Sequence, residues 1–154
     1  DIFDAALRGQ PFFFSQLCFI LRQASKYAII KLGGDVCMNT YKMKLLPKYF
    51  DELRRGSKYI EIRCNDEKRK TIKVEDRIVF INTETGEEAD TTVLALEYYS
   101  SFEELICHHP VESFGFTNAS VEDVIRAIYN IYTHEQEKQY GVLGIILKTV
   151  LSGE

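Results

Sequence analysis

The sequence lacks the stretches that mark membrane spans and secretion. It has no uninterrupted run of about eighteen apolar residues, which is the length that a membrane-spanning helix needs. Its most apolar early run, residues 11–21, is interrupted by Gln16. Neither a basic segment before this run nor a clean cleavage site after it indicates a signal peptide. We therefore expect a cytoplasmic protein without a membrane partner.

The named catalytic motifs are absent as well. The chain has no glycine-rich phosphate loop, no serine in a nucleophile elbow and no HExxH sequence. It has no tryptophan and only three histidines, two of which are the adjacent His108 and His109. Adjacent residues point in different directions, and no third ligand follows at a regular spacing. We expect neither a cofactor nor a bound metal.

Cysteines are few and far apart. The four are Cys18, Cys37, Cys64 and Cys107, and their spacing matches neither a zinc knuckle nor a dense disulfide framework. The sequence therefore favours reduced thiols. A disulfide or a metal site between cysteines that the fold brings together is the alternative.

Acidic residues outnumber basic ones, and the net charge of −4 by itself disfavours strong binding to nucleic acid. The charges are unevenly distributed, however. Residues 42–77 contain twelve basic and seven acidic residues, a net charge of +5, whereas the rest of the chain carries −9. A basic segment is thus available to an anionic ligand, or it is simply a charged surface.

The 154 residues suffice for one domain with its own core. Residues 1–41 differ in character from the rest of the chain, and Phe12 to Ala28 fits an amphipathic helix with a dense aromatic cluster. We interpret residues 1–41 as a helical N-terminal extension that packs on the main domain or joins two copies of the chain. Residues 42–154 form the main domain in this interpretation. Alternatively, the main domain begins near Met38 or Met43.

The main domain alternates between strand and helix patterns. Strands are predicted at residues 42–46, 58–64, 77–81, 89–99 and 140–147, the last of them apolar throughout and hence buried on both faces. Pro47 begins a short helix that Gly56 ends, and serines at 100–101 and at 120 begin two more. Residues 133–139 are polar and precede the last strand. Five or six strands with short helices predict an α+β fold built on a small barrel or a strongly curved sheet.

One predicted strand concentrates charge. Lys58, Glu61 and Arg63 lie within a few residues, and the alternation of a strand places Tyr59, Glu61 and Arg63 on one side. Strands disfavour such charges unless that face is solvated or used. The residues alone leave two interpretations, an amphipathic edge strand with solvated charges or a functional site.

From Met43 onward the sequence resembles the ASCH domain family, relatives of the RNA-binding PUA domains. Four motifs in order carry the resemblance: Gly56-x-Lys58-x-x-Glu61-x-Arg63, then Val74–Phe80, then Tyr98–Leu105, and finally Ile131–Thr133 followed by Tyr140–Ile145. The resemblance implies a small PUA-like β-barrel of five or six strands with short peripheral helices. Residues 1–41 lie outside it.

The resemblance also implies a ligand, RNA or a nucleotide-like molecule, in a cleft beside the Gly-x-Lys-x-x-Glu-x-Arg strand. The expected contacts come from Lys58, Tyr59, Glu61, Arg63 and Tyr49. Lys58 can hold a phosphate as a point charge, and Arg63 can hold it through two parallel hydrogen bonds. The two tyrosines can stack on bases.

Enzymatic activity is the alternative hypothesis. Some small relatives are amidohydrolases that act on acetylated cytidine with a lysine, a threonine and a glutamate, and some are reported as ribonucleases. Lys58 matches that lysine, Glu61 stands where the threonine is expected, and Glu112 is the nearest counterpart of the glutamate. Glu75 also replaces the usual glycine of a Gly-Asp turn. In a hydrolase, Lys58 and Glu61 would be acid–base partners. In a purely structural interpretation, Lys58, Glu61 and Arg63 form a salt-bridged network that holds the cleft together.

Overall fold

The computed structural model describes residues 37–150, which belong to one compact unit. The strands are β1 (Thr40–Leu45), β2 (Ile60–Cys64), β3 (Arg77–Asn82), β4 (Glu88–Tyr99) and β5 (Val142–Thr149). The helices are α2 (Pro47–Arg55), α3 (Phe102–Cys107), α4 (Val121–Tyr129) and α5 (His134–Tyr140), with short 3₁₀ turns η1 (Arg69–Thr71) and η2 (Val111–Phe114). No helix in this range is long and apolar enough to cross a bilayer. The predicted helix at residues 12–28 and the predicted contact between copies through the extension lie outside the described residues.

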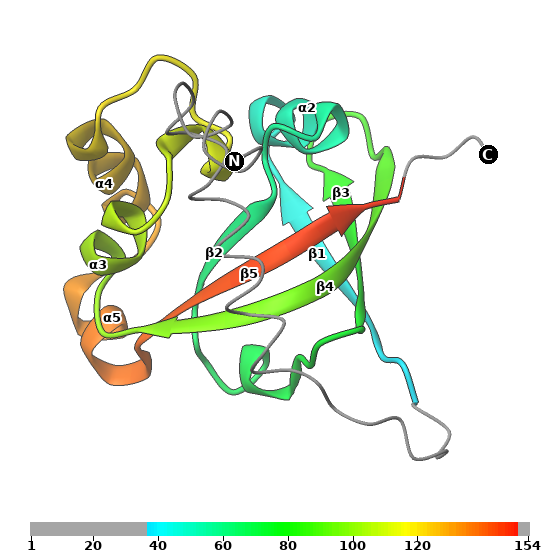
Figure 1. The fold of residues 1–154 in the computed structure, drawn as a ribbon, viewed down its shortest axis with the longest axis horizontal. Coiled ribbons are helices and arrows are strands. Elements are labelled where there is room, and N and C mark those ends of the chain that lie inside the picture. The colour runs from blue at the N-terminus through cyan, green and yellow to red at the C-terminus, as the bar shows by residue number, and fades with distance from the viewer. Residues whose placement is uncertain (1–36, 151–154) are drawn as a thin grey trace, which may run out of the picture. The chain divides into compact units, whose positions relative to one another are not determined.

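The strands form one curled sheet with the order β1-β3-β4-β5-β2 (Figure 1). Strand β1 runs parallel to β3, and the other neighbours are antiparallel. Helices α3, α4 and α5 gather on one flank of the sheet, beside β2 and β5, while α2 lies near one end of β1 and β3 (Figure 1). The predicted α+β fold with a small, strongly curved sheet is confirmed. The sheet leaves β1 and β2 as its two edges.

Two apolar clusters fill the two sides of the sheet. The inner cluster packs side chains of β1, β3, β4 and β5 against Phe50 and Leu53 of α2. The outer cluster packs α3, α4 and the residues around η2 against β2 and β5. Leu143 and Ile145 of β5 belong to the inner cluster and Val142 to the outer one, so β5 is buried on both faces, as its continuous hydrophobicity predicts.

Most helix boundaries follow the expected capping rules. Pro47 opens α2, and Gly56 closes it in the left-handed conformation with φ of 82°. Ser101 and Ser120 cap α3 and α4 through their side-chain oxygens, as predicted. The polar segment at residues 133–139 is helix α5, which the sequence did not predict and which begins with a Thr133–Gln136 capping box. The helix has no apolar stripe to reveal it, and its buried side chain is the carboxylate of Glu137.

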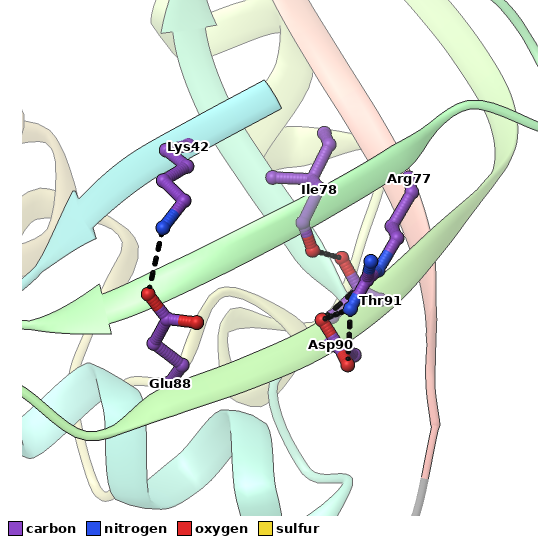
Figure 2. Close-up of polar contacts among 6 residues, drawn as sticks. All are labelled: Lys42, Arg77, Ile78, Glu88, Asp90 and Thr91. Carbon is purple, nitrogen blue, oxygen red and sulfur yellow. Dashed lines mark hydrogen bonds and ion pairs between the residues drawn. The ribbon is translucent and has the colours of Figure 1, made fainter. Parts of the chain in front are cut away.

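The solvent face of β1, β3 and β4 is held by cross-strand polar pairs (Figure 2). Lys42 pairs with Glu88 at 2.9 Å, and the Arg77 guanidinium binds both carboxylate oxygens of Asp90 at 2.7 Å (Figure 2). Exposed pairs of this kind contribute about 0–1 kcal/mol each. Their importance here is electrostatic, because they neutralise part of the basic segment of residues 42–77.

Glu75 occupies a backbone conformation that favours glycine. Its φ is +75°, and it precedes Asp76, a buried carboxylate that accepts hydrogen bonds from the amides of Asn39 and Lys73. Glu75 thus holds a backbone conformation that a glycine would adopt without strain. A non-glycine residue in the left-handed region costs about 1–2 kcal/mol.

Replacing Glu75 with glycine is expected to raise the free energy of unfolding by about 0.5–1 kcal/mol. The relief of backbone strain exceeds the additional entropy that glycine gives the unfolded chain. Urea denaturation measures the change, with Glu75→Ala as the control that removes the carboxylate and keeps the strain. Equal stability of the glycine and alanine variants would contradict this explanation.

Candidate functional site

A cleft of about 240 Å³ opens between the two edge strands of the sheet. Its lining comes from the end of β1, the start of α2, strand β2, the segment around η2 and the end of α4. The lining residues are Lys44, Leu45, Leu46, Tyr49, Lys58, Glu61, Ile62, Arg63, Phe114, Phe116, Ala127, Ile128, Ile131 and Tyr132. Segments far apart in the sequence thus meet at the seam where the curled sheet does not close on itself.

Three charged side chains, one just before β2 and two within it, form the floor of this cleft. Glu61 accepts an ion pair on each oxygen, from Lys58 Nζ at 2.9 Å and from an Arg63 Nη at 2.7 Å. Lys58 and Glu61 are only 3% and 5% exposed, which excludes the interpretation of solvated charges on an open edge strand. We call this group the floor triad. Its net charge is +1.

The ammonium of Lys58 has no unused hydrogen. Besides the bond to Glu61, it donates to the main-chain oxygen of Ile60 at 2.8 Å and to that of Phe114 at 3.2 Å. An ammonium has three N–H donors, so all of them bind acceptors within the protein. Lys58 therefore acts as a cationic anchor that ties the start of β2 to the end of η2.

Arg63 spans the seam between the two edge strands. One Nη donates both to Glu61 and to the main-chain oxygen of Lys44 on β1, the latter at 3.2 Å. Its Nε is buried and has no hydrogen-bond partner among the described residues. Arg63 thus keeps donor capacity beside the Glu61 carboxylate, unlike Lys58.

The electrostatics of the triad hold Glu61 in its ionised form. Burial acts to raise the pKa of Glu61, but the attraction of Lys58 and Arg63 outweighs it, and the pKa lies below its usual range. Burial likewise acts to lower the pKa of Arg63, and the partner Glu61 raises it above its usual value. Burial and the negative charge of Glu61 together raise the pKa of the Tyr49 phenol. At neutral pH the floor therefore carries two cations and one anion.

Aromatic and apolar side chains make the walls and the mouth. The rings of Tyr49 and Phe116 lie 5.2 Å apart at a tilted angle. Burial raises the pKa of the Tyr132 phenol, and the positive charge of the neighbouring Arg63 partly offsets this rise. At the mouth, Leu46 and Ile131 are 53% and 66% exposed. A charged floor with aromatic walls and an apolar mouth suits a flat ring that bears polar edge groups.

Gly115 lets the segment after η2 approach the floor triad closely. Its φ is +90°, and a Cβ there would lie 3.0 Å from Cδ of Lys58 and 3.3 Å from Cδ1 of Tyr49. Replacing Gly115 with alanine is expected to lower the free energy of unfolding by about 2–4 kcal/mol, because crowding adds to backbone strain. Thermal denaturation measures the loss.

Gly86 supplies the matched control for this prediction. Its φ is +75°, but nothing lies within 4 Å of a Cβ built there. Gly86→Ala therefore carries the strain without the crowding. If the two alanine variants lost the same stability, Gly115 would have no role in positioning Lys58.

The structure brings together most of the side chains that the sequence singled out. Tyr49, Lys58, Glu61 and Arg63 all line the cleft. Tyr59 does not line it and instead packs against the outer cluster. The predicted alternation fails at this residue because β2 begins only at Ile60.

Several residues of the site escape sequence reasoning. Phe116 and Tyr132 lie in connections after η2 and α4, where periodicity carries no information about a distant strand. The apolar stripe of the helix that Ser120 begins extends in the sequence to Tyr132, but the helix ends at Tyr129. Glu112, the expected counterpart of the glutamate in the amidohydrolases, is exposed on η2 and does not line the cleft.

The histidines and cysteines have separate surroundings. His108 Nδ1 lies 2.7 Å from the Glu104 main-chain oxygen, while His109 Nε2 lies 2.6 Å from the Glu97 carboxylate. Residues 37–150 contain no group of three His, Cys, Asp or Glu side chains that could hold a metal ion. Cys37, Cys64 and Cys107 are free thiols in that range, and burial raises the pKa of Cys64 to about 11.

The chain is similar to a known family and to two solved structures. A family model described as the ASCH domain matches residues 43–150. The crystal structure of hypothetical protein PH0355 is 33% identical, with a TM-score of 0.64 over 72% of this chain and 99% of that one. The solution structure of protein PF0455 from Pyrococcus furiosus is also 33% identical, with a TM-score of 0.57 over 72% of this chain and 97% of that one. Among curated proteins there is no match.

Proposed function

The chain belongs to the ASCH domain family, and from this premise we propose that its cleft binds the base of an RNA nucleotide or of a nucleotide-like ligand without hydrolysing it. The family has a PUA-like fold and is itself proposed to bind RNA. The observation that carries the proposal is the saturated ammonium of Lys58, which donates to Ile60, Glu61 and Phe114.

A saturated ammonium disfavours catalysis. A lysine that acts as a base or nucleophile needs a free lone pair, and a general acid or base needs a pKa near the working pH. Lys58 is held by three acceptors. Glu61 is held ionised by two cations, with a pKa below its usual range. The pair therefore lacks the proton exchange that an amidohydrolase or ribonuclease would require of it.

The remaining polar capacity of the floor fits the edge of a base. A carboxylate has about four lone-pair sites, and the ion pairs of Glu61 with Lys58 and Arg63 use only part of them. Beside it, the Arg63 guanidinium is 18% exposed and has N–H donors beyond those that bind Glu61 and Lys44. An acceptor next to a donor complements the edge of a nucleobase, which offers donors and acceptors side by side. The rings of Tyr49, Phe116 and Tyr132 supply surfaces for stacking.

The test is a ligand screen with two readouts. Thermal shift with the ribonucleosides, their 5′-monophosphates and short single-stranded RNA should raise the midpoint, because a ligand that binds only the native state stabilises it. Mass spectrometry of the same mixtures, with N4-acetylcytidine and RNA included, should find no product. If the wild type formed a product and a folded Lys58→Met variant did not, the function would be hydrolysis rather than binding. No shift with any of these compounds would overturn the proposal.

A further inference from the structure

Two lysines stand at the mouth of the cleft. Lys44, at the end of β1, lines the cleft itself. Lys48, in the first turn of α2, has its Nζ 5.8 Å from the ring centroid of Tyr49 and 5.6 Å from that of Phe116. Both side chains are exposed. They come from two different elements and reach the same opening.

Neighbouring cations on these two elements are neutralised, whereas Lys44 and Lys48 are not. Lys42 on β1 pairs with Glu88 at 2.9 Å, and Arg54 on α2 pairs with Glu87 at 3.3 Å. Within residues 37–150, no carboxylate forms an ion pair with Lys44 or Lys48. The carboxylate one turn beyond Lys48, that of Glu52, instead binds Arg55 and Ser57. Glu52 attracts Lys48 from beyond ion-pair distance. The mouth therefore carries two ammonium groups that no carboxylate of the described residues binds directly.

The size of the cleft limits what lies inside it. Its volume of about 240 Å³ lies below the roughly 300–1,000 Å³ of typical small-molecule pockets, so the cleft suits one ring system better than a whole nucleotide. The floor also disfavours a phosphate, since the Lys58 donors are all used and the Glu61 carboxylate is ionised. An anionic group would thus find free ammonium donors at the mouth, whereas in the interior it would meet the ionised Glu61 carboxylate and a lysine whose donors are all used.

Building on the proposed function, we propose that Lys44 and Lys48 form a phosphate site at the mouth of the cleft. The ligand is then a nucleotide with its base inward and its phosphate outward, rather than a free nucleoside. Lysine ammonium groups hold phosphate as point charges without a fixed geometry, which suits a flexible backbone. In RNA, the same two lysines would hold the backbone of one unpaired nucleotide.

The experiment compares each ribonucleoside with its 5′-monophosphate by isothermal titration calorimetry. The wild type should bind the monophosphate about 10-fold more tightly at low salt. In the double variant Lys44→Ala/Lys48→Ala this preference should disappear, so that the nucleoside and its monophosphate bind with nearly equal affinity. The matched control is Lys42→Ala/Arg54→Ala, which also removes one cation from β1 and one from α2, and it should keep the preference.

Single-stranded RNA gives a second readout. Each neutralised phosphate of a single strand contributes about 0.7 to the slope of log affinity against log salt concentration. Loss of the one phosphate that both lysines hold should therefore reduce that slope by about 0.7, whereas the control variant should leave it nearly unchanged.

The outcomes separate this inference from the function on which it rests. Equal affinity of the wild type for nucleoside and monophosphate, or a preference that survives in Lys44→Ala/Lys48→Ala, would overturn the phosphate site and leave base binding intact. Failure of every nucleoside, monophosphate and RNA to bind would overturn the proposed function and the phosphate site with it.

Discussion

Replacing Glu61 with alanine is expected to lower the free energy of unfolding by about 3–5 kcal/mol, because it leaves two cations buried without their counter-charge. Lys58 and Arg63 both lie against the same carboxylate, at 2.9 and 2.7 Å. Neither cation can move out to water without giving up its bonds to main-chain oxygens of Ile60, Phe114 and Lys44. Urea denaturation at neutral pH measures the loss.

The control for this prediction is Glu88→Ala, which removes the carboxylate of an exposed pair with Lys42. Exposed pairs contribute about 0–1 kcal/mol, so the two losses should differ severalfold. If Glu61→Ala cost no more than Glu88→Ala, the ion pairs of the floor triad would not hold the cleft together.

The dependence of stability on pH in acid gives a second test of the role of Glu61. The pKa of this carboxyl is lowered in the folded protein, so the stability that the ionised group provides is complete above its unfolded pKa of about 4.3. That stability is lost as the pH falls through the lower folded value. The difference in unfolding free energy between wild type and Glu61→Ala should therefore shrink in strong acid. A constant difference down to pH values below the folded pKa would show that ionisation of Glu61 is not its source.

Replacing Arg63 with methionine is expected to weaken ligand binding by about 10- to 100-fold while leaving the protein folded. The variant keeps Lys58 and Glu61 as a balanced pair, but it removes the guanidinium donors and the excess positive charge of the floor. A hydrogen bond that involves a charged group contributes about 1.5–3 kcal/mol, which corresponds to this range of affinity. The fold should lose about 1–2 kcal/mol through the missing bond to Lys44. Calorimetric titration with ribonucleoside 5′-monophosphates measures the affinity.

Two further variants show whether this effect is specific. Arg77→Met also removes an arginine that pairs with a carboxylate, but this arginine lies on the solvent face of the sheet (Figure 2). The variant should leave affinity unchanged. Arg63→Lys keeps the charge without the planar fork and should fall between wild type and Arg63→Met. Unchanged affinity in a folded Arg63→Met protein would show that the base edge is read elsewhere.

The sequence predicted part of the local geometry of the floor triad. The alternation of a strand places Glu61 and Arg63 on one side but would put Lys58 on the other, and Lys58 reaches Glu61 because β2 begins only at Ile60. The residues alone left solvated charges and a network as alternatives. Burial decides between them, since it comes from Phe114 and the end of α4, which lie more than fifty residues away along the chain.

The rest of the cleft depends on long-range contacts that no local pattern encodes. Phe116 and Tyr132 lie in irregular segments, and their positions follow from the packing of the outer cluster. The approach of Gly115 to Lys58 is likewise visible only in three dimensions. For Tyr59 a local pattern gave the wrong position. Alternation holds only within a strand, and this residue lies just before the strand begins.

Binding of a base on the floor triad is tested most directly by an NMR titration. Two-dimensional ¹H–¹⁵N spectra of the wild type would be followed during addition of each ribonucleoside 5′-monophosphate. We predict that the buried Nε–H signal of Arg63, together with the amides of Ile62, Phe116 and Ile131, shifts in a saturable manner. Shifts confined to the solvent face that carries Lys42, Arg77 and Asp90, with the Arg63 signal unmoved, would contradict it.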